Sequence, residues 1–194
     1  MDLKTNSIKF ESFIKEDLSN PCLQPCKDNT FYCPVSNHTV YWEEKDVFNP
    51  AAVVRNGMVY LLYRAEDTIG RYAGTSRIGL AFSKDGRTFE KYPEPVLYPE
   101  MDEYMKFEWE GGCEDPRIVE DDKGVYYLTY TAYDGDTARL CVATSTDLYR
   151  WKKHGPAFEK AYEGKYTDFW SKSGSIVCSV EGEKLLAVRL NGFY

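Results

Sequence analysis

The sequence predicts an all-β fold made of repeated four-stranded units, the arrangement found in β-propellers. Short β-type runs separated by turn signals follow one another from Val47 onward, and no segment keeps a helical period over three turns. The runs then recur after roughly 60 residues, a spacing typical of propeller blades. A Ser-x-Asp turn also recurs, at Ser83-x-Asp85 and at Ser145-x-Asp147. A β-sandwich whose strands share this spacing by coincidence is the alternative.

The chain divides near residue 45. We expect residues 1–45 to be an irregular N-terminal segment, because prolines stand at positions 21, 25 and 34 and no hydrophobic period persists there. Residues 46–194 carry the predicted strands. The first unit has four of them, at 51–55, 58–64, 76–83 and 88–92. The breaks between them are Asn56-Gly57, which is a type I′ turn signal, a Gly/Thr-rich loop at 68–75, and Asp85-Gly86.

A second unit follows the order of the first. Its strands are predicted at 117–120, 125–133, 138–145 and 149–152. Tyr60–Arg64 aligns with Tyr127–Thr131 at an offset of 127 − 60 = 67 residues. Ile78–Asp85 aligns with Leu140–Asp147 at an offset of 140 − 78 = 62 residues, which Phe89 and Trp151 keep.

A third copy begins at 171–177 and continues through 184–190. Four strands, four more and about two give two and a half units, whereas a propeller ring closes with about four to eight. A ring cut at that point would expose strand edges and half of its core. We therefore expect these 194 residues to be the N-terminal part of a longer protein.

Composition narrows the function classes. The chain has 24 Lys and Arg against 31 Asp and Glu, a net charge of −7, which argues against a nucleic-acid partner. No apolar run is long enough to span a membrane, and the N-terminus lacks a signal-peptide core, so we expect a cytoplasmic protein. Aromatic residues make up 15% of the chain, a content suited equally to an aromatic-rich β core and to sugar binding.

The six cysteines do not predict disulfides, because the chain has no export signal and needs no covalent staples. We expect Cys113, Cys141 and Cys178 to be free buried thiols in strand-like contexts. Cys22, Cys26 and Cys33 are spaced unlike any zinc knuckle, and the only two histidines are remote in sequence. No metal site is therefore predicted.

Polar residues at the start of each unit are the candidate site. The innermost strand of a propeller blade lines the central channel, so Asn49, Glu114-Asp115-Pro116-Arg117 and Lys172 are expected to converge there. Buried charges need partners or a ligand. Gly111 and Gly112 permit a close backbone approach, and Trp109 could form the floor of a sugar site. A purely structural ion pair of Asp115 with Arg64 or Arg117 is the alternative.

A second polar cluster ends an apolar strand at Tyr63-Arg64-Ala65-Glu66-Asp67. Strand alternation places Arg64 and Glu66 on one face, and Tyr63, Ala65 and Asp67 on the other. The Arg64 guanidinium offers a fork for sugar hydroxyls or carboxylates. A solvated strand end is the alternative.

These motifs resemble glycoside hydrolase family 130. The resemblance covers residues 40–190, about the first half of the family domain, and rests on Val47–Ala51, Tyr63–Asp67, Ser76–Gly79, Gly112–Ile118 and Trp170–Ser173. It implies a five-bladed β-propeller, of which this chain would hold about the first two and a half blades. The family comprises β-mannoside phosphorylases and β-1,2-mannosidases.

The resemblance also implies residue roles. Asp115 matches the general acid, and Asn49 and Arg64 match residues that hold the mannosyl unit. Glu114 and Arg117 shape the same subsite, and Glu66, Asp67 and Trp109 complete the expected substrate-binding set. Lys172 matches a lysine that grips inorganic phosphate. Phosphorylases carry an arginine shortly before that lysine, where this chain has Lys153 and His154 as possible substitutes.

The resulting hypothesis is an enzyme that cleaves β-mannosidic linkages with inversion, either by hydrolysis or by phosphorolysis to mannose 1-phosphate. A phosphorylase needs one acid and cationic phosphate ligands, whereas an inverting hydrolase needs a second carboxylate as base. We expect no cofactor apart from phosphate as co-substrate, a β-mannoside oligosaccharide as substrate, and possible homo-oligomers. The alternatives are an inactive fragment, a non-catalytic sugar-binding propeller, and another five-bladed glycosidase such as an arabinanase-like enzyme.

Overall fold

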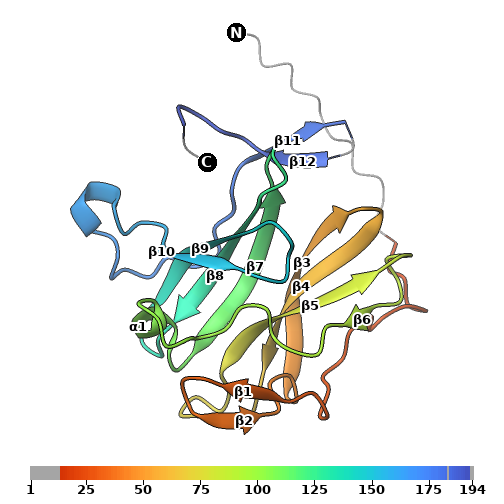
Figure 1. Ribbon diagram of the computed structural model, residues 1–194, viewed down its shortest axis with the longest axis horizontal. Coiled ribbons are helices and arrows are strands. Elements are labelled where there is room, and N and C mark those ends of the chain that lie inside the picture. The colour runs from red at the N-terminus through yellow and green to blue at the C-terminus, as the bar shows by residue number, and fades with distance from the viewer. Residues whose placement is uncertain (1–13, 183, 193–194) are drawn as a thin grey trace.

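The computed structural model describes residues 14–182 and 184–192, and it is built almost wholly from β-strands (Figure 1). Two groups of antiparallel strands lie side by side and form an open, twisted assembly rather than a closed barrel. The prediction of an all-β chain is confirmed. None of the helices in the described ranges is long and apolar enough to cross a membrane.

The first unit contains four antiparallel strands. They are β3 (Asp46–Arg55), β4 (Met58–Glu66), β5 (Ser76–Ser83) and β6 (Glu90–Lys91). The tight turn at Asn56-Gly57 joins β3 to β4, and both residues have positive φ, as a type I′ turn requires. The strand order β3-β4-β5-β6 follows the sequence, so each strand pairs with its chain neighbour.

The second unit repeats this order. Its strands are β7 (Gly112–Glu120), β8 (Tyr126–Tyr133), β9 (Ala138–Ser145) and β10 (Lys152–Pro156). A short helix, α1 (Met105–Glu108), precedes β7. The register between β8 and β9 is unbroken over eight pairs. The repeat that the sequence predicted is therefore present in the structure.

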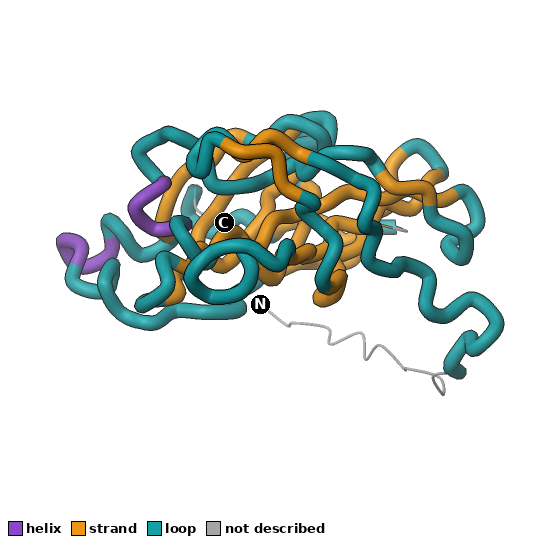
Figure 2. Tube along the Cα trace, turned by 90° about the horizontal axis from the view of Figure 1, so that it is seen from below, coloured by secondary structure: helices purple, strands orange, loops and turns teal. Residues whose placement is uncertain are grey.

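The first unit contacts the second along β7. In the described part of the chain, strand pairing between the units is limited to a parallel bridge between Ser76 on β5 and Gly112 on β7. Arg55 adds a tie across the units, because its Nη1 donates to the Asp147 carbonyl at 2.6 Å and its guanidinium lies over the Tyr126 ring. Seen edge-on, the strands form one broad layer with loops above and below it (Figure 2).

The segment before β3 is less irregular than predicted. β1 (Phe31–Cys33) and β2 (His38–Val40) form an antiparallel hairpin. Phe31, Cys33, Val40 and Trp42 are buried together against the first unit. The hairpin escaped prediction because three-residue strands leave no visible alternation in the sequence.

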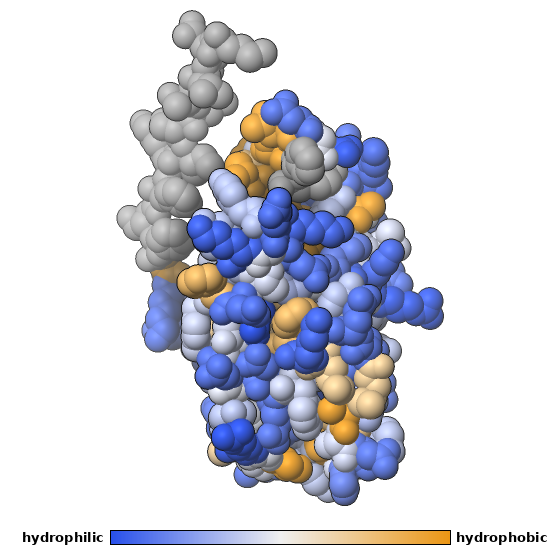
Figure 3. Space-filling model, turned by 90° about the vertical axis from the view of Figure 1, so that its left-hand side faces the viewer, coloured by the Kyte–Doolittle hydropathy of each residue, from blue (hydrophilic) through white to orange (hydrophobic). Residues whose placement is uncertain are grey.

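A second hairpin begins the third repeat. β11 (Cys178–Glu181) pairs with β12 (Lys184–Ala187), which meets β7 at a single parallel bridge. Hydrophobic side chains gather at the end of the molecule where this hairpin lies (Figure 3). Cys178 is exposed there, which corrects the prediction of a buried thiol, whereas Cys113 and Cys141 are buried as predicted. Among the described strands, β11 pairs with β12 alone. A 3₁₀ turn (Ala161–Gly164) projects from the segment before this hairpin.

Candidate active site

A β-bulge with a positive φ angle opens the inner strand of each complete unit. The register of β3 shifts at Asn49-Pro50 and that of β7 shifts at Asp115-Pro116. Asn49 has φ of 47° and Asp115 has φ of 49°, a left-handed conformation that Asn and Asp tolerate better than most residues. Ser173 at the start of the third repeat has φ of 63°. Such strained, bulged positions turn side chains out of the ladder and are common beside active sites.

The two bulges bring Asn49 and Asp115 into contact. Asn49 Nδ2 donates a hydrogen bond of 2.7 Å to Asp115 Oδ1, although the residues are far apart in sequence. Arg64 Nη1 lies 3.3 Å from the same oxygen, and Lys172 Nζ lies 3.4 Å from Oδ2. The first repeat therefore contributes two groups and the third repeat one group to a carboxylate that belongs to the second repeat.

The Arg64 guanidinium connects the remaining carboxylates of the cluster. Its Nη2 lies 3.0 Å from Glu114 Oε1 and 2.5 Å from Glu66 Oε1. Lys172 closes the network with a contact of 2.6 Å to Glu114 Oε2. The Arg64 side chain is 14% exposed and that of Lys172 is 38% exposed. Solvent, and hence a ligand, reaches the cluster on the Lys172 side.

Burial by itself would raise the pKa of Asp115. The hydrogen bond from Asn49 and the charges of Arg64 and Lys172 outweigh burial, so the pKa of this carboxyl lies below its usual value. The pKa of Glu66 is lowered in the same sense, because Lys45 and Arg64 outweigh its burial. Lys172 has a raised pKa, because Glu114 and Asp115 outweigh its desolvation. In the free chain Asp115 is an anion held by three donors at neutral pH.

This arrangement offers both kinds of group that sugar chemistry needs. Asn49 and Arg64 present donors to ring hydroxyls, and Asp115 is a carboxyl that can exchange a proton beside them. Lys172 is the cation that a bound anion would meet first. Within residues 14–182 and 184–192, no group of three or more His, Cys, Asp and Glu side chains is arranged to hold a metal ion.

Ser76 is a member of the cluster that the sequence reasoning did not single out. Arg64 Nε donates to Ser76 Oγ at 2.9 Å, and that hydroxyl donates to Glu66 Oε1 at 3.1 Å. These bonds fix the guanidinium plane on which the site depends. The available signal was the Ser76–Gly79 motif, where Ser76 follows the loop that returns to the site.

Two other predicted residues lie at the margin of the cluster. Arg117 stands just beyond the bulge, exposed, and donates to the Pro116 carbonyl at 2.8 Å. Trp109 is half-buried. It packs against the hydrophobic cluster that joins the β1–β2 hairpin to the first unit and that contains Trp42 and Tyr63. The structure brings neither of them into contact with Asp115.

Asp67, which directly follows β4, takes part in a buried ion pair outside the cluster. Its carboxylate accepts from Arg77 Nη1 at 2.6 Å, and both side chains are 1% exposed. The same pair recurs in the second unit, where Arg139 Nη1 lies 2.6 Å from Asp134 Oδ2. Asp67 is therefore part of a structural ion pair that each unit repeats.

His154 and Lys153 do not reach the phosphate side of the cluster either. His154 lies on β10, three strands from β7 and hence about 14 Å away, where Nε2 contacts Thr144 Oγ1 at 2.8 Å. Lys153 is buried against Glu108, with Nζ to Oε2 of 2.7 Å. Of the predicted phosphate ligands, Lys172 alone stands in the cluster.

Lys153 belongs to a buried triad that both units share. Tyr130 Oη donates to Glu108 at 2.8 Å, and Lys153 contacts the other oxygen of that carboxylate. In the first unit the corresponding groups are Tyr63, Glu43 and Lys91, with contacts of 3.1 Å and 2.7 Å. The repetition explains why position 153 is a lysine without any role for it in phosphate binding.

The family model for beta-1,4-mannooligosaccharide phosphorylases matches residues 27–192. The chain belongs to glycoside hydrolase family 130. Among curated family members, a 1,2-beta-oligomannan phosphorylase from Thermoanaerobacter sp. (strain X514) is 40% identical over 126 residues. A beta-1,2-mannobiose phosphorylase from the same organism is 36% identical over 133 residues. These alignments cover 61% and 62% of this chain, but only 40% and 41% of the relatives.

Solved structures of family 130 resemble the chain over nearly its whole length. One comes from work on glycoside hydrolases of the mannoside phosphorylase family that target β-1,2-mannosidic linkages in Candida mannan. It is 44% identical, has a TM-score of 0.91, and is matched over 96% of this chain and 52% of its own. A glycosyl hydrolase from Bacteroides ovatus is also 44% identical, with a TM-score of 0.90 over 95% of this chain and 52% of its own. The chain thus spans about half the length of these structures.

Proposed function

We propose that the protein cleaves β-mannosidic linkages and that Asp115 is its general acid. The observation that carries the proposal is the convergence of Asn49 and Arg64 from the first repeat and Lys172 from the third on this one carboxylate of the second repeat. An inverting mechanism needs one acid at the leaving oxygen, while phosphate or an activated water attacks from the opposite face. The substrate is a β-mannoside oligosaccharide, in keeping with the family 130 relatives.

The lowered pKa of Asp115 is compatible with an acid role once substrate is bound. Asn49 and Arg64 would turn to sugar hydroxyls, and Lys172 would turn to the incoming anion. Each of these exchanges removes a group that now stabilises the charged form of Asp115, so its pKa rises in the complex. The site therefore acquires its proton when the substrates displace the three donors.

Phosphorolysis is the leading reaction, because Lys172 offers a cation beside Asp115 and the curated relatives are named phosphorylases. Hydrolysis is the second candidate. It is favoured by the placement of Lys153 and His154 outside the site, which leaves Lys172 alone among the predicted phosphate ligands. Phosphate is the co-substrate in the first case, and neither case requires another cofactor.

The complete protein is proposed to be a five-bladed β-propeller. The first unit, the second unit and the β11–β12 hairpin would be blades one, two and part of three, in the domain that we place at residues 46–194. Support comes from the repeated strand order and from family 130 structures about twice as long as this chain. In this arrangement the bulges at Asn49 and Asp115 would face the central channel.

Incubation of the full-length protein with β-1,2-mannobiose, with and without inorganic phosphate, tests the reaction. Formation of mannose 1-phosphate that depends on phosphate is the expected result. Release of free mannose at the same rate without phosphate would replace phosphorolysis by hydrolysis. If neither product forms from β-1,2- or β-1,4-mannobiose, the proposed function is wrong.

Asp115→Asn tests the assignment of the acid. The amide keeps the shape of the carboxyl and cannot donate the catalytic proton, so kcat should fall by a factor of roughly 10² or more. Asp122→Asn, an exposed aspartate on the turn after β7, is the matched control and should keep full activity. Circular dichroism confirms that both variants fold. Full activity of Asp115→Asn would contradict the assignment.

A further inference from the structure

Three aromatic rings form a partly exposed cluster, which we call the aromatic shelf. Its members are Tyr72, Tyr133 and Trp170. The ring centroids of Tyr72 and Tyr133 lie 6.0 Å apart, and those of Tyr133 and Trp170 lie 6.1 Å apart. Tyr72 is 39% exposed and Trp170 is 64% exposed. Exposed aromatic rings that lie in contact with one another form a contiguous apolar surface, and such surfaces are candidate ligand-binding sites.

Two glycines allow the tyrosine rings of the shelf to pack directly against the backbone. A Cβ atom on Gly111 would lie 2.3 Å from the Tyr133 ring, and one on Gly135 would lie 2.2 Å from the Tyr72 hydroxyl. The two tyrosine side chains thus lie directly against glycine backbone. The Tyr133 hydroxyl also donates to the Gly135 carbonyl at 3.0 Å. A ring fixed before binding loses little conformational entropy when a ligand stacks on it.

The shelf adjoins the candidate active site. Tyr133 is paired with Gly112, three residues before Asp115 on β7. Trp170 precedes Lys172 by two residues, a span of at most about 7 Å. Ser171 between them is fixed by a parallel bridge to Arg139 and by a backbone bond to Ala138. The same backbone that carries Lys172 to Asp115 therefore places Trp170 beside Tyr133.

The shelf also draws one ring from each repeat. Tyr72 comes from the loop after β4, Tyr133 from the end of β8, and Trp170 from the segment that opens the third repeat. The same three repeats also supply the residues of the cluster around Asp115. A ligand that extends from Asp115 across this end of the units would pass over all three rings.

We propose that the aromatic shelf binds a further sugar ring, beyond the two rings that flank the bond cleaved at Asp115. The occupant is the C–H face of a pyranose in a longer mannoside chain, because such faces are apolar, flat and matched in size to Tyr and Trp rings. This inference rests on the proposed function and adds a preference for substrates longer than a disaccharide. The shelf determines specificity and takes no part in the chemistry.

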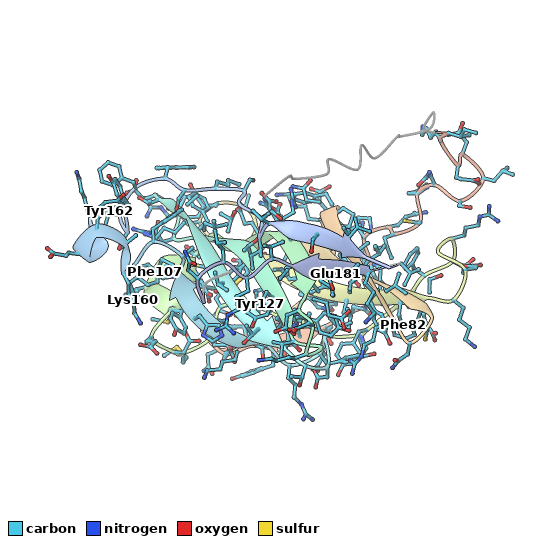
Figure 4. The ribbon with its side chains drawn as sticks, turned by 90° about the horizontal axis from the view of Figure 1, so that it is seen from above. Phe82, Phe107, Tyr127, Lys160, Tyr162 and Glu181 are labelled. Carbon is cyan, nitrogen blue, oxygen red and sulfur yellow. The ribbon has the colours of Figure 1, made fainter. Side chains whose placement is uncertain are left out.

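A second aromatic group supplies the control. Tyr162, Tyr166 and Phe169 stack with one another on the projecting segment before Trp170. Tyr162 is 78% exposed and points outward at the edge of the molecule (Figure 4). It is more exposed than Trp170, which is 64% exposed, is close to it in sequence, and lies outside the shelf.

The test uses the full-length protein and two substrates, β-1,2-mannobiose and β-1,2-mannotetraose. For Trp170→Ala, the ratio of kcat/KM on the tetrasaccharide to that on the disaccharide should fall by about tenfold, as for a lost aromatic contact. Trp170→Phe should restore most of the ratio, and Tyr162→Ala should leave it at the wild-type value. An unchanged ratio in Trp170→Ala would overturn the shelf as a sugar site.

Binding measurements separate this proposal from the proposed function. In the Asp115→Asn background, calorimetry gives the Kd of β-1,2-mannotetraose without turnover. Tighter binding of the tetrasaccharide than of the disaccharide, lost on Trp170→Ala, supports the shelf even if the wild type cleaves neither substrate. Equal binding of both sugars, or a loss of folding in Trp170→Ala that Trp170→Phe corrects, shows instead that the rings pack against protein.

Discussion

Two aspartates of the chain meet arginines in opposite surroundings. Asp67 and Arg77 are each 1% exposed, and the carboxylate takes further hydrogen bonds from the backbone N–H groups of Ile69 and Thr75. Asp115 instead meets Arg64 and a half-exposed Lys172 at an open edge. A closed pair has no partner to exchange, whereas the open pair can exchange its partners for a substrate. Access of a ligand to the carboxylate, and not the presence of an ion pair, therefore distinguishes the candidate site residue Asp115 from the structural residue Asp67.

Asp67→Asn should therefore destabilise the fold. The change leaves the Arg77 charge buried without its counter-ion, and breaking a buried pair in this way costs about 3–5 kcal/mol. The free energy of unfolding from urea titration measures the loss. Asp134→Asn is the matched control and should cost less, because Arg139 keeps Asp168 and the Thr167 carbonyl as partners. Equal losses in both variants would contradict this explanation.

At the scale of elements, the sequence predicted the strands best where the side-chain pattern is uninterrupted. The ranges 76–83 and 138–145 coincide with β5 and β9. β3 and β7 begin five residues earlier than predicted, because Asn49-Pro50 and Asp115-Pro116 read as strand breaks. In the structure each of these steps is a bulge that the strand passes through. The bulges that carry the candidate site are thus also the places where strand prediction failed.

The repeat carries information about the site that the sequence analysis did not use. Asp67 and Asp134 share the offset of 67 residues, and Lys91 and Lys153 share that of 62. Positions that stay the same in both units hold each unit together, as these four do. The candidate site residues instead differ between the units: Asn49 of the first unit corresponds to Asp115 of the second, and Arg64 corresponds to Thr131. Convergence of the site itself was predictable from the inner-strand positions, whereas the contacts of Ser76 were not.

The Ser-x-Asp turns are the second recurring element, and their hydrogen bonds are the same in both units. The backbone N–H of Thr88 and that of Arg87, with the Ser83 hydroxyl, donate to Asp85 and lower its pKa to about 2. Asp147 accepts from Tyr149, Arg150 and Ser145 in the corresponding way. A carboxylate in such a turn satisfies three donors that would otherwise depend on water.

The Asp85→Asn variant should show how the charge of Asp85 in this turn contributes to stability at different pH values. The folded-state pKa of Asp85, about 2, lies below the ordinary aspartate value near 3.9. The charged carboxylate therefore stabilises the fold fully above pH 3.9, and this stabilisation is lost as the pH falls toward 2. The urea midpoint of the wild type should exceed that of Asp85→Asn by a constant amount from pH 7 to 5. The difference should shrink between pH 4 and pH 3. A difference independent of pH would show that the charge is not involved.

At the scale of the whole molecule, the candidate site belongs to no single unit. Asn49, Asp115 and Lys172 come from three repeats, and in the described chain the strands of different repeats pair through isolated parallel bridges. The ion pairs of the cluster join all three repeats, in addition to the hydrophobic core that the first two units share. A ligand bound there would contact all three repeats, so its binding should stabilise their arrangement relative to one another.

Hydrogen exchange tests this description of the molecule. β4 and β8 each lie between two paired strands and contain no exposed residue, so their amides should exchange last. β11 and β12 meet the rest of the chain at one bridge, with Val180 59% and Leu185 62% exposed, and their amides should exchange roughly tenfold faster or more. Addition of β-1,2-mannobiose with phosphate should slow exchange near Asn49, Asp115 and Lys172 together, because one ligand holds three repeats. Protection confined to a single repeat would mean that the cluster does not act as one site.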